Sequence, residues 1–285
     1  MQFFANGGID AWIVRGHADD LSTLDVVDVV NILCLPDMRN APLSAHVMAA
    51  ATEFCRVRRA VFIADPPRWL STATDALAWM ADPAVAAARS DFSAVYFPEL
   101  VLADGRTVAP SGTVAGIYAQ VEPWIAPAGT GFAPDGVAGV AVTIGDDDNA
   151  LLDDAGIDAI RLFSTIGVRV WGARTTSTDP QWRYVSVRRL ALFIESSVDR
   201  GLQWVVFEPN NNALWQSITL EVTNFMLSLF SQGAFAGATA NDAFFVQCDP
   251  DLEGSSVNVT IGFAPLIPAE FAIVEIRKLV ATPPG

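Results

Sequence analysis

The chain is poor in lysine and in positive charge as a whole, and this shortage excludes some classes of partner. Its 285 residues include 17 basic and 32 acidic residues, which gives a formal net charge of −15. Lys278 is the only lysine. A nucleic-acid-binding protein needs a basic face to neutralise phosphates, and anionic membranes attract basic segments. The composition therefore argues against nucleic acid as a partner and against docking on a membrane.

Cysteines and long apolar runs are also scarce. Cys34, Cys55 and Cys248 are far apart and form no CxxC pair, so we interpret them as free thiols in a reducing compartment. No apolar run reaches the roughly 18 residues that a spanning helix needs. The N-terminal segment lacks the charged region and cleavage site of a signal peptide. The sequence therefore predicts no direct membrane insertion.

The motifs of common enzyme classes are missing. There is no GxGxxG, no P-loop and no GxSxG. His17 and His46 are the only histidines, so few candidates exist for the base that a nucleophile requires. The acidic cluster at 146–154 does not fit a calcium loop, because Leu151 stands where the invariant glycine belongs. We interpret that cluster as a solvated loop with helix-start acids. We predict no catalytic residue, no cofactor and no metal ligand.

Hydrophobic residues are plentiful, at 52% of the chain, and their pattern favours an α/β fold in two domains. In the first part, apolar runs of strand length alternate with segments of helical periodicity. We expect strands at 29–35, 60–64, 92–97 and 168–171, and helices at 43–57, 70–88 and 158–163. This alternation predicts a mostly parallel sheet covered by helices. Residues 103–154, rich in Gly, Pro, Thr and Asp, are expected to form a loop-rich insertion with a short strand at 137–144.

A polar stretch at 175–181 predicts a domain boundary, which divides the chain into residues 1–176 and 177–285. The second domain is expected to be an α/β unit with a mixed sheet. Its predicted elements are helices at 185–200 and 213–231 and strands at 203–207, 243–249, 257–263 and 271–279.

Several segments carry a family resemblance through their order and spacing. They are 3–8 (FFANGG), 168–175 (VRVWGART), 182–190 (WRYVSVRRL), 207–210 (FEPN) and 262–265 (GFAP). Together they resemble the tail sheath family of contractile phages, pyocin-type particles and related extracellular contractile injection systems. Each segment alone is weakly specific, whereas the ordered set is distinctive and covers nearly the whole chain.

This resemblance implies a structural subunit without catalysis. Sheath subunits form hexameric rings that stack helically around an inner tube, and contraction of the lattice drives the tube through a target envelope. The implied partners are other sheath subunits, the inner tube protein, and baseplate and terminator proteins. Neighbouring subunits are linked by β-augmentation between terminal arms. The particle, a phage tail or a tail-like assembly, is implied to assemble in the bacterial cytoplasm.

The resemblance also places the long helix at 213–231 against the tube, and Glu221 is the only charge of that helix. We therefore expect a polar contact with the tube. The expected contact residues are Trp215, Gln216, Ser217, Thr219, Glu221, Asn224 and Ser228. The expected strand of the C-terminal arm, 271–279, would present Phe271, Ile273, Glu275, Arg277 and Leu279 to a neighbouring subunit.

Three alternatives stay open at the level of the sequence. The long helix could serve the core alone. The chain could be a hydrolase-like α/β enzyme that uses the 146–154 loop or His46, or a non-contractile adaptor with the same fold. In the family an N-terminal arm precedes the FFxNGG segment, whereas here Met1 stands directly before it. We expect from this that the chain alone stays monomeric and does not build an extended sheath.

Overall fold

The computed structural model describes residues 5–6, 10–13, 20–40, 44–250, 256–266 and 272–280. The chain divides into two compact units, Met1–Arg188 and Arg189–Gly285. The division between the units falls inside a helix, whereas the sequence places the domain boundary after residue 176. That boundary stays a prediction, and each unit is considered by itself below.

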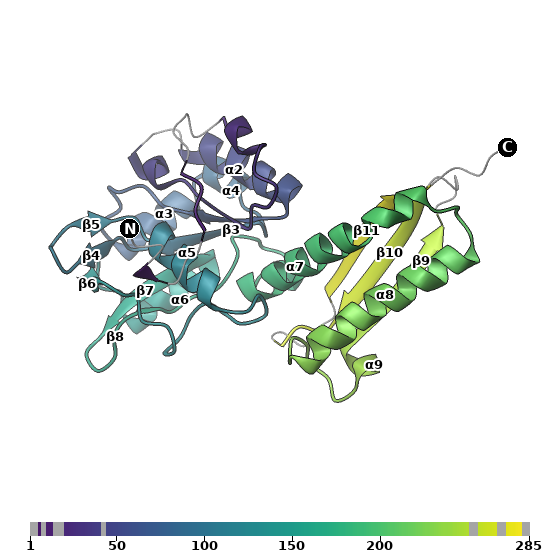
Figure 1. The fold of residues 1–285 in the computed structure, drawn as a ribbon. Coiled ribbons are helices and arrows are strands. Elements are labelled where there is room, and N and C mark those ends of the chain that lie inside the picture. The colour runs from purple at the N-terminus through teal and green to yellow at the C-terminus, as the bar shows by residue number, and fades with distance from the viewer. Residues whose placement is uncertain are drawn as a thin grey trace. The chain divides into compact units, whose positions relative to one another are not determined.

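A five-stranded sheet forms the centre of the N-terminal unit (Figure 1). Its order is β1-β2-β3-β7-β8, and the first four strands run parallel while β8 is antiparallel to β7. The strands are β1 (Ile32–Cys34), β2 (Val61–Ala64), β3 (Ser93–Phe97), β7 (Ile157–Phe163) and β8 (Gly167–Val170). The predicted mostly parallel sheet is confirmed.

Helices cover this sheet on both faces, as the apolar strands require. Phe62 and Val95 belong to a core that also takes in residues of the helices on one face. These helices are α2 (Ser44–Arg58), α3 (Ala73–Met80), α4 (Pro83–Ala87) and α6 (Asp146–Ala155). On the other face, Tyr96 of β3 meets Tyr118 of α5 (Ser111–Gln120) edge to face, with a hydrogen bond of 2.8 Å between the hydroxyls. Short 3₁₀ helices lie at η1 (Ser22–Leu24) and η2 (Pro36–Asn40).

The predicted helix at 70–88 is divided before Pro83 into two helices, and local chemistry explains the break. The Thr72 side chain accepts the Asp75 N–H and begins α3, while the Asp82 side chain accepts the Ala84 N–H and begins α4 with Pro83 in its first turn. Proline suits the first helical turn because its missing N–H would have no partner there.

Two predictions in the middle of the chain are wrong. The acidic cluster at 146–154 lies in the helix α6 and not in a loop, although its first three aspartates are helix-start acids as expected. These aspartates face the positive end of the helix dipole, and Gly156 ends the helix in a left-handed conformation. Residues 158–163 are not helical but belong to the strand β7, because pairing with β3 and burial decide the structure there. The insertion also contains α5 and a small antiparallel sheet of β4 (Leu100–Leu102), β5 (Thr107–Val108) and β6 (Val137–Val140).

The C-terminal unit is built on a three-stranded antiparallel sheet in the order β11-β10-β9. Its strands are β9 (Phe244–Pro250), β10 (Ser256–Phe263) and β11 (Ala272–Leu279). The helices of this part of the chain are α7 (Val185–Gly201), α8 (Asn212–Ser231) and α9 (Ala240–Ala243), with 3₁₀ helices η3 (Pro180–Trp182) and η4 (Gln203–Phe207). Five predicted elements are confirmed to within two residues where the structure describes them: 185–200, 213–231, 243–249, 257–263 and 271–279.

The expected strand at 203–207 is wrong, since these residues form η4. Val205 is buried, but Val206 and Phe207 are exposed, so the apolar run does not fill a sheet interior. The sheet is consequently antiparallel throughout and not mixed.

Candidate functional site

The helix α8 has one apolar face that anchors it to its own unit. Asn211 caps its first turn, because the side-chain Oδ1 accepts the Leu214 N–H at 3.0 Å. The buried side chains recur at helical spacing: Leu214, Ile218, Val222, Met226 and Leu229. The helix lies beside β9 (Figure 1). Its opposite face is therefore free of the core and open to a partner.

The predicted contact residues of α8 do not all share that open face. Gln216, Ser217, Glu221, Asn224 and Ser228 are exposed, whereas Trp215 and Thr219 lie half-buried on a flank. Several of these side chains have partners inside their own unit. The Trp215 indole donates to Asn210 Oδ1 at 2.7 Å, Thr219 Oγ1 donates to the Trp215 carbonyl at 2.8 Å, and Ser217 Oγ donates to the Ala213 carbonyl at 2.9 Å. The Trp204 indole donates to Glu221 Oε2 at 3.2 Å.

Sequence reasoning missed two residues on the open face of α8. Leu220 is 63% exposed and Leu227 is 40% exposed. They stand seven residues apart, which places them on the same side of the helix, opposite Ile218 and Met226. The seven-residue spacing is visible in the sequence and indicates a shared side of the helix. The open face thus combines amides and hydroxyls with two apolar side chains.

A groove of about 460 Å³ runs along the half-buried flank of α8. It is lined by Asn212, Trp215, Gln216, Thr219, Leu220, Thr223 and Cys248. None of these side chains is charged at neutral pH, because burial raises the pKa of the Cys248 thiol to about 11. The groove therefore offers shape and neutral hydrogen bonding and no net charge.

The sheet of the C-terminal unit has one buried and one open face. In β11, Ala272, Val274 and Ile276 are buried, whereas the predicted arm residues Ile273, Glu275, Arg277 and Leu279 are exposed. The alternation is the period of two that a half-buried strand requires. The remaining predicted arm residue, Phe271, lies outside the described residues.

β11 pairs with β10 of its own chain and forms one edge of the sheet. Its end is tied to α7, because Lys278 Nζ donates to the Asp199 carbonyl at 2.8 Å and to Asp199 Oδ1 at 3.0 Å. Arg277 Nε donates to Ser256 Oγ at 2.8 Å. An edge strand presents main-chain groups that another strand can pair with.

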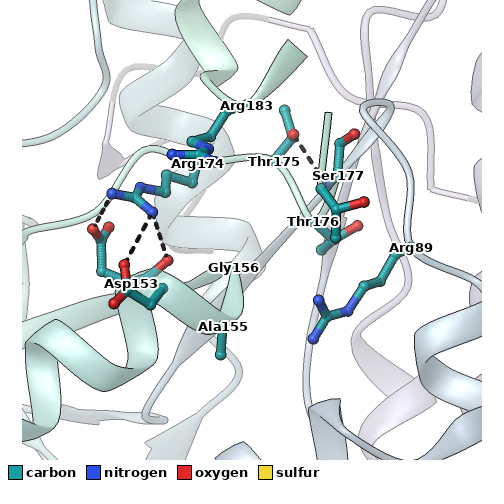
Figure 2. A pocket seen from close by; sticks show the side chains of 11 residues that line it. Arg89, Asp153, Ala155, Gly156, Arg174, Thr175, Thr176, Ser177 and Arg183 are labelled. Atoms are coloured by element: carbon teal, nitrogen blue, oxygen red, sulfur yellow. Dashed lines mark hydrogen bonds and ion pairs between the residues drawn. The ribbon is translucent and has the colours of Figure 1, made fainter. Parts of the chain in front are cut away.

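A small polar pocket lies in the N-terminal unit, where the end of α6 meets the segment that follows β8 (Figure 2). Its volume is about 190 Å³. It is lined by Arg89, Asp153, Asp154, Ala155, Gly156, Arg174, Thr175, Thr176, Ser177, Thr178 and Arg183. On one wall Arg174 Nη2 lies 2.6 Å from Asp153 Oδ2, and its Nη1 donates to the Asp153 carbonyl at 3.1 Å. Burial raises the pKa of the Asp153 carboxyl against the lowering effect of this arginine.

The residues considered for an enzyme do not come together in the described structure. His46 is exposed on α2 and lines neither the groove nor the pocket, and His17 lies outside the described residues. Asp146 is exposed and pairs with Arg161 at 2.7 Å. Within the described ranges no three His, Cys, Asp or Glu side chains cluster as metal ligands would. The same ranges contain no helix with the length and apolarity to span a membrane.

Comparison with known proteins places the chain among tail sheath proteins. The family model of the phage tail sheath C-terminal domain matches residues 177–277. A putative prophage major tail sheath protein of Pseudomonas aeruginosa (strain UCBPP-PA14) is 31% identical over 126 residues, which make up 42% of this chain and 31% of that protein. The matched segment thus spans under a third of the length of this curated relative.

Solved structures extend the similarity over almost the whole chain. The contracted sheath complex of an extracellular contractile injection system, PVC, superposes with a TM-score of 0.78 and 28% identity over 96% of this chain and 78% of that one. The contracted helical sheath of the anti-feeding prophage gives a TM-score of 0.74 and 29% identity over 96% of this chain and 79% of that one. The C-terminal part matches the family model in sequence and the solved sheaths match nearly the whole chain in fold, so the chain belongs to the contractile tail sheath family.

Proposed function

We propose that this chain is a structural subunit of a contractile tail sheath. It polymerises helically, in hexameric rings, around an inner tube and contracts to drive that tube through a target envelope. The observation that carries the proposal is the superposition of 96% of the chain on the sheath of a contractile injection system. A shared fold over one domain alone would leave the role open, but here the superposition includes both units.

The proposed partners are other copies of the sheath subunit, the inner tube protein, and baseplate and terminator proteins. The particle is assembled in the cytoplasm of a bacterium as part of a phage tail or a tail-like assembly. The subunit works by binding and rearrangement, without catalysis and without a cofactor. The uncharged α8 groove and the position of His46 outside both the groove and the polar pocket support this proposal.

Two surfaces of the C-terminal unit are proposed to make these contacts. The open face of α8, with Gln216, Leu220, Asn224 and Leu227, contacts the inner tube. The edge strand β11 takes part in strand pairing between subunits. The open face of α8 supports this proposal because it lies away from the core of its own unit. The edge strand β11 supports it because an edge strand presents main-chain groups that another strand can pair with.

Immunolabelling tests the proposal directly. An antibody raised against the chain is used to label particles from the source organism under negative-stain electron microscopy. We expect label along striated tubes in both a long and a short form, since a contractile sheath exists in two lattices. Label on particles of one length alone would favour a non-contractile adaptor, and label in the soluble fraction alone would contradict a sheath role.

A further inference from the structure

The polar pocket of the N-terminal unit contains more positive charge than its own carboxylates neutralise. Arg89, Arg174 and Arg183 all line it. Arg174 is paired with Asp153, and Asp154 is 84% exposed on the rim, 3.7 Å from the same arginine. Among the described residues, no carboxylate lies within ion-pair distance of Arg89 or Arg183. The charge of Arg183 also lowers the pKa of the Asp153 carboxyl, so Asp153 offsets part of two positive charges, and the three arginines still outnumber the two carboxylates of the pocket.

Arg89 in particular has unused hydrogen-bonding capacity. Its Nη2 donates to the Met80 carbonyl at 3.3 Å, while its Nε is shielded from solvent without an acceptor in the described structure. Figure 2 shows the Arg89 side chain extending into the pocket from the side opposite the Arg174–Asp153 pair. Buried donors without an acceptor are uncommon, because they lose the hydrogen bonds that water would supply. The shielded Nε is out of reach of an entering ion, whose contact with Arg89 would be made through the terminal guanidinium nitrogens.

The size of the pocket limits what that acceptor can be. Sites for drug-sized ligands and cofactors measure about 300–1,000 Å³, and this pocket holds about 190 Å³. A nucleotide does not fit, but a single tetrahedral or planar oxyanion does. The planar fork of arginine matches the oxygen spacing of phosphate and carboxylate groups.

One feature opposes an anion here and has to be weighed. The last turn of α6 ends at the pocket, and helix C-termini favour cations. Arg174 offsets this effect, because it binds both the Asp153 carboxylate and the Asp153 main-chain carbonyl of that turn. Arg89 and Arg183 are left as the groups that an entering anion would meet.

We propose that this pocket is a binding site for a single oxyanion, held by the guanidinium groups of Arg89 and Arg183. Two oxyanions match this site: free phosphate, and the side-chain carboxylate of a second copy of this acidic chain. The first source is independent of the proposed sheath function. The second rests on it, because only a polymer brings copies of the chain together.

The test uses the full-length purified chain in phosphate-free buffer. Inorganic phosphate is titrated at constant ionic strength, with chloride as the balancing ion, and binding is measured by calorimetry. We expect saturable binding that weakens at least about tenfold in Arg89→Gln and in Arg183→Gln, because each variant loses a charged donor. Arg89→Lys keeps the positive charge but loses the planar pair of donors. Its affinity for phosphate should lie between those of the parent chain and Arg89→Gln. Arg106→Gln is the matched control, since Arg106 is exposed and paired with Asp104.

A second arm separates the two sources. Self-association of the same proteins is measured by analytical ultracentrifugation, with circular dichroism to verify folding. Self-association that is lost in Arg89→Gln and competed by phosphate would assign the site to a carboxylate of a second copy. If no protein binds phosphate and Arg89→Gln self-associates like the parent chain, the oxyanion site is refuted. Particles labelled by the antibody would still support the sheath role in that case, so the two failures can be told apart.

Discussion

Among single residues, Asp65 is a buried acid whose titration should change the free energy of unfolding with pH. Its carboxylate accepts the Ser111 N–H at 2.9 Å and the Ser111 hydroxyl at 2.5 Å, yet burial raises its pKa to about 6. An acid with a raised folded-state pKa stabilises the fold at low pH, and this contribution is lost as the pH rises through the folded pKa.

We therefore expect the N-terminal unit to lose roughly 2 kcal/mol of unfolding free energy between about pH 4 and pH 7 through this group. Asp65→Asn keeps the hydrogen bonds to Ser111 and removes the titration. Urea unfolding at several pH values checks the prediction. A variant with the same pH slope as the parent chain would show that Asp65 is not its origin.

Gly172 stands in the VRVWGART segment for a steric reason. A Cβ at this position would lie 2.5 Å from Asp158 Oδ1 and 2.8 Å from Asp158 Cα. Asp158 cannot move away easily, because it is fully buried in β7 and its Oδ1 accepts the Arg174 N–H at 2.7 Å.

We predict that Gly172→Ala destabilises the N-terminal unit by about 2 kcal/mol or more, in the range of overpacked cores. Gly112→Ala is the control, because its Cβ would meet nothing within 4 Å and it lies in the helix α5. That variant should be neutral or slightly stabilising. Equal melting temperatures for the two variants would contradict the steric argument.

At the scale of elements, one face of α8 packs in the core of its unit and the opposite face is proposed to contact the inner tube. Leu220 and Leu227 are exposed, whereas Ile218 is fully buried. Removing exposed apolar surface changes the unfolding free energy little, but truncating a buried isoleucine leaves a cavity. Substitutions on the two faces should therefore have different consequences.

Leu220→Asn combined with Leu227→Asn should change the stability of the C-terminal unit by less than about 0.5 kcal/mol and reduce co-sedimentation with the inner tube. Ile218→Ala should cost about 2–5 kcal/mol. Glu221→Gln should leave tube binding and its salt dependence unchanged, because the contact is proposed to be polar and apolar. A tube affinity that falls steeply with salt would overturn this assignment of α8.

Most elements were predictable from the sequence because their apolar pattern matches their burial. Residues 92–97, 213–231 and 243–249 carry that pattern clearly. The predictions of a loop at 146–154 and of a strand at 203–207 are wrong. A run of acidic residues can continue as a helix beyond its first turn, and an apolar run can lie partly exposed on the surface. The polar pocket could not be foreseen, because the fold brings Arg89 and Arg174 together from distant segments.

For the molecule as a whole, the net charge affects the association of one copy of the chain with another. Each chain carries a formal charge of −15, so neighbouring copies in a polymer repel each other. Salt screens such repulsion over a Debye length of about 10 Å at 0.1 M. Association of sheath subunits should therefore strengthen with salt rather than weaken.

We predict that the fraction of chain in sedimenting polymer rises between about 50 mM and 500 mM sodium chloride. Centrifugation of sheath particles, with the pellet and supernatant quantified on gels, measures this. Dissociation at high salt would mean that specific ion pairs between copies outweigh their general repulsion.

The tie between Lys278 and Asp199 has a practical consequence for chemists who wish to trap the assembled particle. Cross-linkers that acylate amines find one lysine in this sequence, and its ammonium group is already bound to a carboxylate and a carbonyl of α7. Such reagents should capture few neighbouring copies. Dihydrazide linkers aimed at the 32 acidic side chains offer many more points of attachment, and trypsin should then release fragments that end almost entirely in arginine.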